Sequence, residues 1–337
     1  MGLVNQTISE NMKVNILKIF SSIVAVALGV LNASVAQAAF PEKPIRVIIG
    51  FPAGGPLDQH MRLLAGKLQT SLGKPIVIDY KAGAGGTIGA QFVAQSDADG
   101  YTLLLANTGT LVINPAIYTQ KPYDTLRDFV PVARTAQQAL AFIVNDKVPV
   151  KTLKELVQYA KTNPGKLNYG SAGSGGISHL VPEMFKVETG INMVHIPYKG
   201  TAPAFTDLMA GHVDFMADSI PQAANHLRDG KIRVLAVTSN RRSPALPGVP
   251  TVNETGVATM EVVGFYGLLA PKNTPNDIVR KLSQAIKEAL ESPEIQKTMT
   301  EQGADPAYLN AEQFTVFLAK EMPRWALAVK QAGAKLD

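Results

Sequence analysis

The sequence predicts an α/β protein built as two lobes, with two crossings of the chain between them. Short β-branched runs alternate with amphipathic helical stretches from Pro44 onward, a pattern typical of α/β folds with a mostly parallel sheet. The alternation runs through two cycles, and amphipathic helices without matching strands follow the second cycle. Such helices must pack on a sheet that is already built, so we expect the chain to return to the first lobe.

The first cycle lies in residues 39–139, which we assign to lobe 1. A proline- and glycine-rich segment at 52–56 ends its first strand, and Gly73 ends the helix that follows. The predicted elements are strands at 45–50, 76–78 and 102–105, and helices at 57–72 and 87–95.

The second cycle lies in residues 140–261, which we assign to lobe 2. Its first helix is predicted to start at Thr152, because Glu155 three residues later completes a capping box. The predicted strands are 140–144, 167–169, 193–196, 213–216 and 232–237, and the further helices are 177–188, 202–210 and 221–228.

The segment 262–337 is predicted to return to lobe 1. It contains an apolar run at 262–269 and helices that start at Thr274–Pro275 and at Asn310. The chain would then cross between the lobes near Ala139 and again near Val262. Two crossings make a hinge, and we expect a ligand cleft between the lobes.

The N-terminus has the features of an export signal. Lys13 and Lys18 precede an apolar run at 19–31, and the small residues of Ala36–Gln37–Ala38 follow it. The run is shorter than the roughly 18 to 20 residues that a membrane span needs. We therefore predict a signal peptide at 1–38, cleavage after Ala38 and a soluble periplasmic protein, with Met12 as an alternative start to Met1.

Composition excludes several kinds of chemistry. The chain has no cysteine, so disulfides, thiolate catalysis and cysteine-bound metal are absent. It holds 32 basic and 27 acidic residues, and this mild excess is spread along the chain, which suits an anionic small molecule better than a nucleic acid. The five histidines show no metal-ligand spacing. We expect no metal, no cofactor and no catalytic residue.

Glycine-rich loops follow four predicted strands, after Phe51, Tyr80, Tyr169 and Tyr198. None is a nucleotide fingerprint: Ile88 stands where a dinucleotide motif needs glycine, and no Gly-Lys-Ser/Thr loop occurs. No Gly-x-Ser-x-Gly nucleophile motif occurs either. What remains is binding by backbone N–H groups at helix N-termini, which can hold a carboxylate without a formal cation.

Candidate ligand contacts lie at these strand ends. They are Phe51, Gly54, Gly55, Asp58, Asn107, Thr108, Ser171, Gly173, Ser174, Gly175, Gly176, Ser178, His179, Thr201 and Asp218.

Several of these candidates also have a structural interpretation. Asp58 can cap its own helix, and Thr201 is predicted to be a helix N-cap. The serines can form turns, and His179 can be satisfied locally. Phe265 and Tyr266, at the returning crossing, fit hinge packing as well as a cleft wall.

The chain resembles the Bug receptors, the extracytoplasmic solute receptors of tripartite tricarboxylate transporters. The resemblance covers nearly all of the mature chain and rests on several motifs in order. These are the runs at 44–58, 83–89, 99–103, 169–175 with His179–Leu180, 197–203, 236–239 and 246–251.

The resemblance implies a periplasmic binding protein with a Venus-flytrap fold, similar to type II. It also implies a carboxylated ligand, held largely by backbone amides and ordered water, and delivery to a large and a small membrane subunit. We expect a monomer. Three positions depart from the family pattern: Gly176 replaces a usual serine, Pro182 a small helix former, and Phe265 a frequent tryptophan.

Two other functions stay open at this point. A sensor subunit that presents its liganded form to a signalling receptor would use the same closed clamp. A periplasmic enzyme needs a positioned base or nucleophile, and the loops offer mainly glycines, hydroxyls and isolated carboxylates. The ligand itself can be a dicarboxylate, an amino acid or an aromatic acid.

Overall fold

The computed structural model describes residues 40–198 and 200–335. The predicted signal peptide and the cleavage after Ala38 lie outside these residues. Within them, no helix combines the length and the apolar character that a membrane crossing requires.

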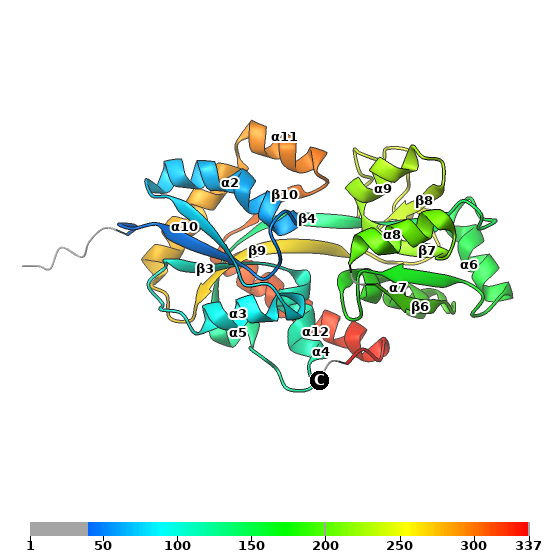
Figure 1. Ribbon diagram of the computed structural model, residues 1–337, viewed down its shortest axis with the longest axis horizontal. Helices are drawn as coiled ribbons and strands as arrows, with labels where there is room; N and C mark the ends of the chain where they lie inside the picture. Colours follow the sequence, from blue (N-terminus) through cyan, green and yellow to red (C-terminus); the bar gives the residue numbers. More distant parts are fainter. Residues whose placement is uncertain (1–39, 199, 336–337) are drawn as a thin grey trace, which may run out of the picture. The chain divides into compact units, whose positions relative to one another are not determined.

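Ten strands in the described residues form one sheet (Figure 1). They are β1 (Ile45–Ile49), β2 (Ile76–Tyr80), β3 (Thr102–Asn107), β4 (Phe129–Asn145), β5 (Asn168–Ser171), β6 (Val194–Pro197), β7 (Phe215–Ser219), β8 (Ile232–Val237), β9 (Val263–Pro271) and β10 (Asp305–Leu309). The order across the sheet is β2-β1-β3-β9-β4-β7-β5-β6, and both β8 and β10 also pair with β4.

Helices connect these strands. The first part of the chain contains α2 (Pro56–Leu72), η1 (Ala84–Gly86), α3 (Thr87–Ala94), η2 (Gly109–Ile113), α4 (Asn114–Ile117) and α5 (Thr125–Asp128). The middle part contains α6 (Leu153–Thr162), α7 (Ile177–Thr189), α8 (Thr201–Ala210), α9 (Ile220–Leu227) and η3 (Asn253–Thr255). The last part contains α10 (Asn276–Leu290), α11 (Pro293–Glu301) and α12 (Ala311–Gln331).

The long strand β4 belongs to two groups of strands. Its first part, up to Ala139, pairs with β9 and β10, and its last part, from Leu140, pairs with β7 and β8. Ala139 faces Val263 of β9, so the outgoing and the returning chain lie side by side at this point (Figure 1). We propose a division there, and we use "lobe 1" for residues 43–139 and 262–335 and "lobe 2" for residues 140–261.

The strand directions correct the expectation of a mostly parallel sheet. β1 pairs in parallel with β2 and β3, and β5 pairs in parallel with β6 and β7. Every pairing of β4 and of β9 is antiparallel. The sheet is therefore mixed: antiparallel strands lie at its centre and parallel strands lie toward both edges.

The last part of the chain also contains a strand, which corrects the expectation of helices alone. β10, with the sequence Asp-Pro-Ala-Tyr-Leu, pairs antiparallel with β4. This segment lacks β-branched residues, and its proline gives no β-strand signal. The pairing comes from the neighbouring strand, since β4 offers an edge beside it.

The parallel strands fix the position of the loops that are predicted to bind a ligand. In lobe 1, β1, β2 and β3 lead into the N-termini of α2, η1–α3 and η2. In lobe 2, β5, β6 and β7 lead into the N-termini of α7, α8 and α9. Because parallel neighbours end at the same edge, each lobe gathers three helix starts in one place.

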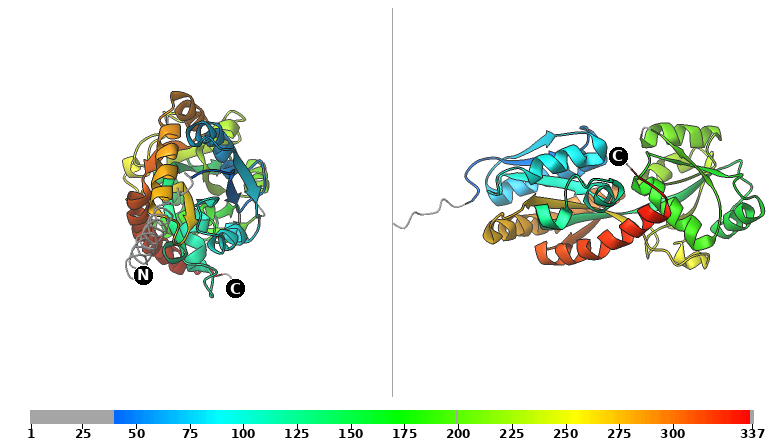
Figure 2. Two further views of the ribbon diagram at one scale, coloured as in Figure 1. Left: turned by 90° about the vertical axis from the view of Figure 1, so that its left-hand side faces the viewer. Right: turned by 90° about the horizontal axis from the view of Figure 1, so that it is seen from below.

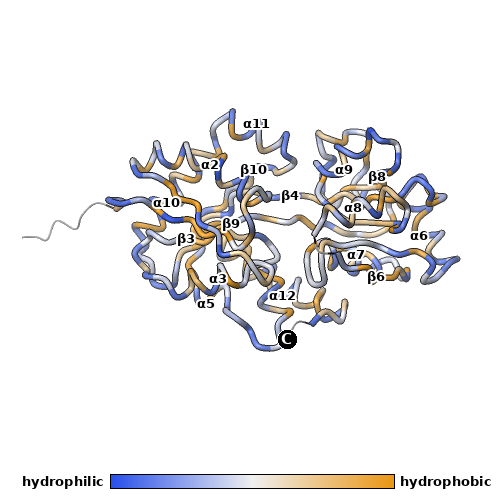
Figure 3. Tube along the Cα trace, viewed as in Figure 1, coloured by the Kyte–Doolittle hydropathy of each residue, from blue (hydrophilic) through white to orange (hydrophobic). Residues whose placement is uncertain are grey.

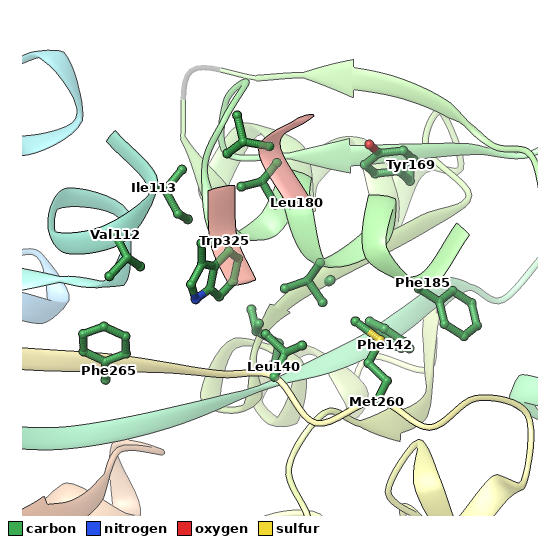
Figure 4. Packing of buried hydrophobic residues seen from close by; sticks show 14 of the residues in the cluster. Val112, Ile113, Leu140, Phe142, Tyr169, Leu180, Phe185, Met260, Phe265 and Trp325 are labelled. Carbon is green, nitrogen blue, oxygen red and sulfur yellow. The ribbon is translucent and has the colours of Figure 1, made fainter. Parts of the chain in front are cut away.

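An apolar core runs through both lobes. Hydrophobic stretches follow the central strands, and polar stretches follow the exposed helix faces (Figure 3). One buried cluster contains Trp325 of α12 together with Ile113 and Leu140 and with Leu180 of α7 (Figure 4). α12 contacts β4 and η2, and it also contacts α7 (Figure 2, right). This helix therefore packs against lobe 2 as well as lobe 1.

Candidate ligand-binding site

Three loops of lobe 1 pack into one unit at the ends of β1, β2 and β3. A Cβ on Gly50 would come within 2.5 Å of the Gly86 Cα, so the first two loops touch through their backbones. The Thr110 hydroxyl donates a hydrogen bond to the Gly85 carbonyl (3.1 Å), and the Asn114 amide donates to the same oxygen (2.9 Å). The third loop thus holds the second.

Asp58 is fully engaged within lobe 1. One carboxylate oxygen accepts the Gly54 N–H (2.7 Å), and the other accepts hydrogen bonds from Arg62 Nε (2.8 Å) and the Tyr80 hydroxyl (2.7 Å). Burial by itself would raise the pKa of this carboxyl, but the hydrogen bonds from Gly54, Tyr80 and Arg62 outweigh burial and lower the pKa. The carboxylate thus ties its helix to the preceding loop and does not cap an N–H group of the helix itself, and a ligand contact from Asp58 stays a prediction.

Asn107 and Thr108 hold the end of β3. The Asn107 side-chain oxygen accepts the Thr110 N–H (3.0 Å). The Thr108 hydroxyl is buried; it accepts the Phe265 N–H (2.7 Å) and donates to the Phe265 carbonyl (3.4 Å). Both side chains therefore fix the loop that starts at the end of β3, and a ligand contact from either stays a prediction.

The loop after β5 in lobe 2 is held by its own side chains. The Ser171 hydroxyl accepts the Gly173 N–H (3.2 Å), and the Ser178 hydroxyl accepts the Ala172 N–H (3.0 Å). His179 Nδ1 accepts the Gly175 N–H (3.0 Å). The backbone groups nearest β5 are thus already paired.

Other groups at this loop remain available. Within the described residues, no acceptor is bonded to the N–H groups of Ser174, Ile177 or Ser178. Ser174 is also exposed, and its hydroxyl has no hydrogen bond to the described part of the chain. These donors belong to the N-terminus of α7, where backbone N–H groups and the helix dipole favour an anion.

The same loop touches lobe 1. Gly175 has φ +79°, and a Cβ there would overlap the side chain of Ile117 in α4. Ile177, the first residue of α7, lies close to Gly264 of β9. Gly176 differs from Gly175, because its φ is −75° and a side chain would meet only the Gly173 carbonyl. The start of α7 in lobe 2 therefore contacts both α4 and β9 of lobe 1.

Asp218 and Thr201 meet at the second and third loops of lobe 2. Thr201 is the first residue of α8, and Gly200 (φ +109°) is the N-cap, which corrects the predicted N-cap role of Thr201. The Thr201 hydroxyl donates to Asp218 (3.3 Å), and the Ser219 N–H donates to the other carboxylate oxygen (2.6 Å). Burial raises the pKa of Asp218 to about 6.

The helix N-termini differ in whether an acidic side chain lies in the first turn of the helix. α2 carries Asp58 in its first turn, whereas α3, α7, α8 and α9 have no acidic residue there. A carboxylate at α2 would meet an existing negative charge, although Arg62 partly offsets it. The start of α7 combines donors that are unpaired within the described residues with the absence of an acid in its first turn.

Comparison with known proteins decides the family. A family model described as the tripartite tricarboxylate transporter family receptor matches residues 60–334. The chain belongs to this family. BugT of Bordetella pertussis (strain Tohama I) is 37% identical over 312 residues, which cover 92% of this chain and 96% of BugT.

Solved structures agree with this family assignment. R. palustris Rpa4515 with adipate has a TM-score of 0.79 at 34% identity, over 88% of this chain and 100% of that chain. MatC from Rhodopseudomonas palustris with bound malate has a TM-score of 0.74 at 32% identity, over 86% and 100%. The predicted family and the two-lobed α/β fold class are thereby confirmed, and the family is described as one of receptors.

In this transporter-family receptor, Phe265 and Tyr266 lie side by side at the returning crossing, but their side chains pack against different residues. Phe265 is buried and packs edge-to-face on Phe314 and Phe317 of α12, so it belongs to the core. The Tyr266 hydroxyl donates to the Gln138 side chain (3.0 Å) beside a cavity of about 30 Å³. Phe265 therefore packs in the core, and a hinge or cleft-wall role for either residue stays a prediction.

Sequence reasoning missed two residues of this receptor's candidate site. His195 in β6 hydrogen-bonds Ser171 (2.7 Å between Nε2 and Oγ), and Ile117 touches the Gly175 loop. Neither stands in a glycine loop, and neither has a sequence neighbour that signals the contact. Only the parallel pairing of β5 with β6 and the meeting of the lobes bring them to the site.

Proposed function

We propose that this protein is a periplasmic receptor that holds a small carboxylate between its lobes and delivers it to the membrane subunits of a tripartite tricarboxylate transporter. The observation that carries the proposal is the N-terminus of α7. Its N–H groups at Ser174, Ile177 and Ser178 are unpaired within the described residues, and no acid occupies its first turn. One ligand carboxylate binds there, between the lobe 2 loop and lobe 1.

A dicarboxylate is the ligand class that we favour. The related structures with adipate and with malate each hold an acid with two carboxyl groups. Lobe 1 has helix starts of its own, and Ile117, the last residue of α4 in that lobe, lies against Gly175. The second carboxylate would bind on that side. Export through the predicted signal peptide places the receptor in the periplasm.

Thermal unfolding of the mature protein tests the proposal. Malate, adipate and succinate should be compared with the neutral diamide of each acid. A dicarboxylate that binds only the folded protein stabilises it by about 2.7 kcal/mol at a hundred times its Kd, which raises the melting temperature by several degrees. The diamides should produce no shift. Equal shifts from acid and diamide, or no shift from any carboxylate at millimolar concentration, would argue against the proposed ligand class.

A further inference from the structure

The rings of two histidines stack next to the loop 171–175, which follows β5 in lobe 2. The rings of His179 in α7 and His195 in β6 lie 3.9 Å apart between centroids, with 14° between their planes. The ring of Tyr169 continues the stack at 4.9 Å from His195. His179 is buried and His195 is partly buried, and no group of three or more metal-ligating side chains occurs in the described residues.

Each histidine holds a different end of the loop 171–175. His179 Nδ1 accepts the Gly175 N–H at the far end (3.0 Å). His195 Nε2 lies 2.7 Å from the Ser171 hydroxyl at the near end, and this hydroxyl also contacts the backbone of Gly173. The exposed residue between the two ends is Ser174, whose N–H is unpaired within the described residues.

We propose that the stacked His179–His195 pair positions the binding loop, so that the unpaired donors at the start of α7 keep the arrangement that a carboxylate needs. The proposal deepens the proposed function and rests on it for the ligand. The two histidines are positioning residues, because their ring nitrogens bond to the loop. The sequence suggested His179 as a direct contact, but its Nδ1 is occupied by Gly175.

His179 and His195 can position the loop in this way only while both imidazole rings are neutral. His179 can accept the Gly175 N–H only while Nδ1 carries no proton, and two charged rings 3.9 Å apart would repel each other. The other titratable groups around the stack are Tyr169, Glu183 and Lys186, where Glu183 accepts hydrogen bonds from both Tyr169 and Lys186. Burial lowers the pKa of both histidines, and it lowers that of His195 to about 4.

Matched variants distinguish the contribution of the His179 ring from that of its hydrogen bond with the Gly175 N–H. His179→Phe keeps a flat ring in the stack but removes the acceptor for Gly175. His179→Asn loses the ring but retains an acceptor oxygen near the place of Nδ1. His212→Ala serves as the control, because His212 lies in lobe 2 with an exposed side chain whose partner among the described residues is Asp207.

Two readouts test the positioning role. In the ligand-free protein, amide hydrogen exchange at Gly175 should speed up at least tenfold in His179→Phe and recover toward wild type in His179→Asn. Calorimetry with the acid that binds wild type should show a Kd about tenfold weaker for His179→Phe, near the value of one lost hydrogen bond, and a Kd within threefold of wild type for His179→Asn. Wild-type affinity should fall as the pH approaches 4, where His195 takes up a proton, and the same titration of His179→Phe separates this fall from protonation of the ligand.

The outcomes distinguish this inference from the proposed function. If wild type binds no carboxylate, the proposed function fails, while hydrogen exchange at Gly175 still tests the stack. If wild type binds but His179→Phe matches His212→Ala in exchange, affinity and pH profile, the positioning role is wrong. Circular dichroism on every variant confirms that the fold is intact before either conclusion is drawn.

Discussion

At the scale of single residues, the site is defined by which polar groups are already used. Asp58, Ser171, Ser178 and His179 stand at the strand ends where a carboxylate receptor needs polar groups, yet each is bonded within the chain. Ser174 differs from them, because its side chain and its N–H have no partner in the described residues. Ser171, Ser178 and His179 therefore hold the loop in place, while the groups still able to bind a ligand are others, such as the hydroxyl and the N–H of Ser174.

Ser174→Ala should weaken carboxylate binding modestly. The hydroxyl adds one neutral hydrogen bond, worth about 1 kcal/mol or roughly a fivefold change in Kd, while the backbone donors remain. Calorimetry measures the change, with Ser71→Ala as the control at an exposed serine near the end of α2. Unchanged affinity would show that this hydroxyl does not touch the ligand.

Asp218→Asn should make the folded protein more stable at neutral pH. Burial raises the pKa of Asp218 from 3.8 to about 6, so the folded state holds this proton more tightly than the unfolded chain does. The resulting stability is complete below pH 4 and is lost as the pH rises through 6. The loss is on the order of 3 kcal/mol, and a neutral asparagine avoids it.

Urea unfolding at pH 4 and pH 7.5 measures this difference. The gain from Asp218→Asn should be largest at pH 7.5 and should vanish near pH 4. A wild-type protein that is more stable than the variant at pH 7.5 would mean that the carboxylate is better paired than its contacts with Thr201 and Ser219 indicate.

At the scale of elements, α7 and its loop depend on contact with α4. Gly175 lies in the left-handed region, where a side chain costs about 1–2 kcal/mol, and a Cβ there would also overlap Ile117. Gly175→Ala should therefore lower the free energy of unfolding by about 2 kcal/mol or more. The overlap, unlike the backbone strain, depends on the size of residue 117.

A double-mutant cycle with Ile117→Ala isolates the overlap. Gly175→Ala should cost less in the Ile117→Ala background, because the smaller side chain leaves room for the new methyl group. Urea unfolding of the four proteins gives the coupling free energy. Equal costs in both backgrounds would mean that α4 and the loop do not press on each other in solution.

The sequence predicts elements well where the apolar pattern is regular. The expected strand at 232–237 is β8, and the expected helix start at 177 is the start of α7. The first half of β4 was missed because Pro131, Arg134 and the glutamines at 137 and 138 interrupt the apolar run. Contacts such as Ser171–His195 depend on strand pairing over many residues, which no local pattern encodes.

At the scale of the whole molecule, the lobes are joined by more than the two crossing strands. The single tryptophan, Trp325, is buried in a cluster that includes residues of both lobes. Any ligand-driven movement about the crossings must therefore keep or rebuild this packing. We expect the two lobes to unfold together, because the shared cluster couples them.

Trp325→Ala should test this coupling. Removing a buried tryptophan costs about 3–5 kcal/mol. In wild type, circular dichroism and tryptophan fluorescence should report one coincident urea transition. In Trp325→Ala, circular dichroism should show an earlier midpoint and a broader or split transition. Two separate transitions in wild type would contradict a shared core.

The most direct test of the account follows the backbone amides of the lobe 2 loop during ligand titration. Two-dimensional amide NMR of the mature protein, titrated with malate or adipate, reports each N–H group separately. The amides of Ser174, Ile177 and Ser178 should move most, while those of Ala172, Gly173 and Gly175, which already have acceptors, should move least. Saturating shifts confined to other parts of the protein, with these three amides unmoved, would contradict the site.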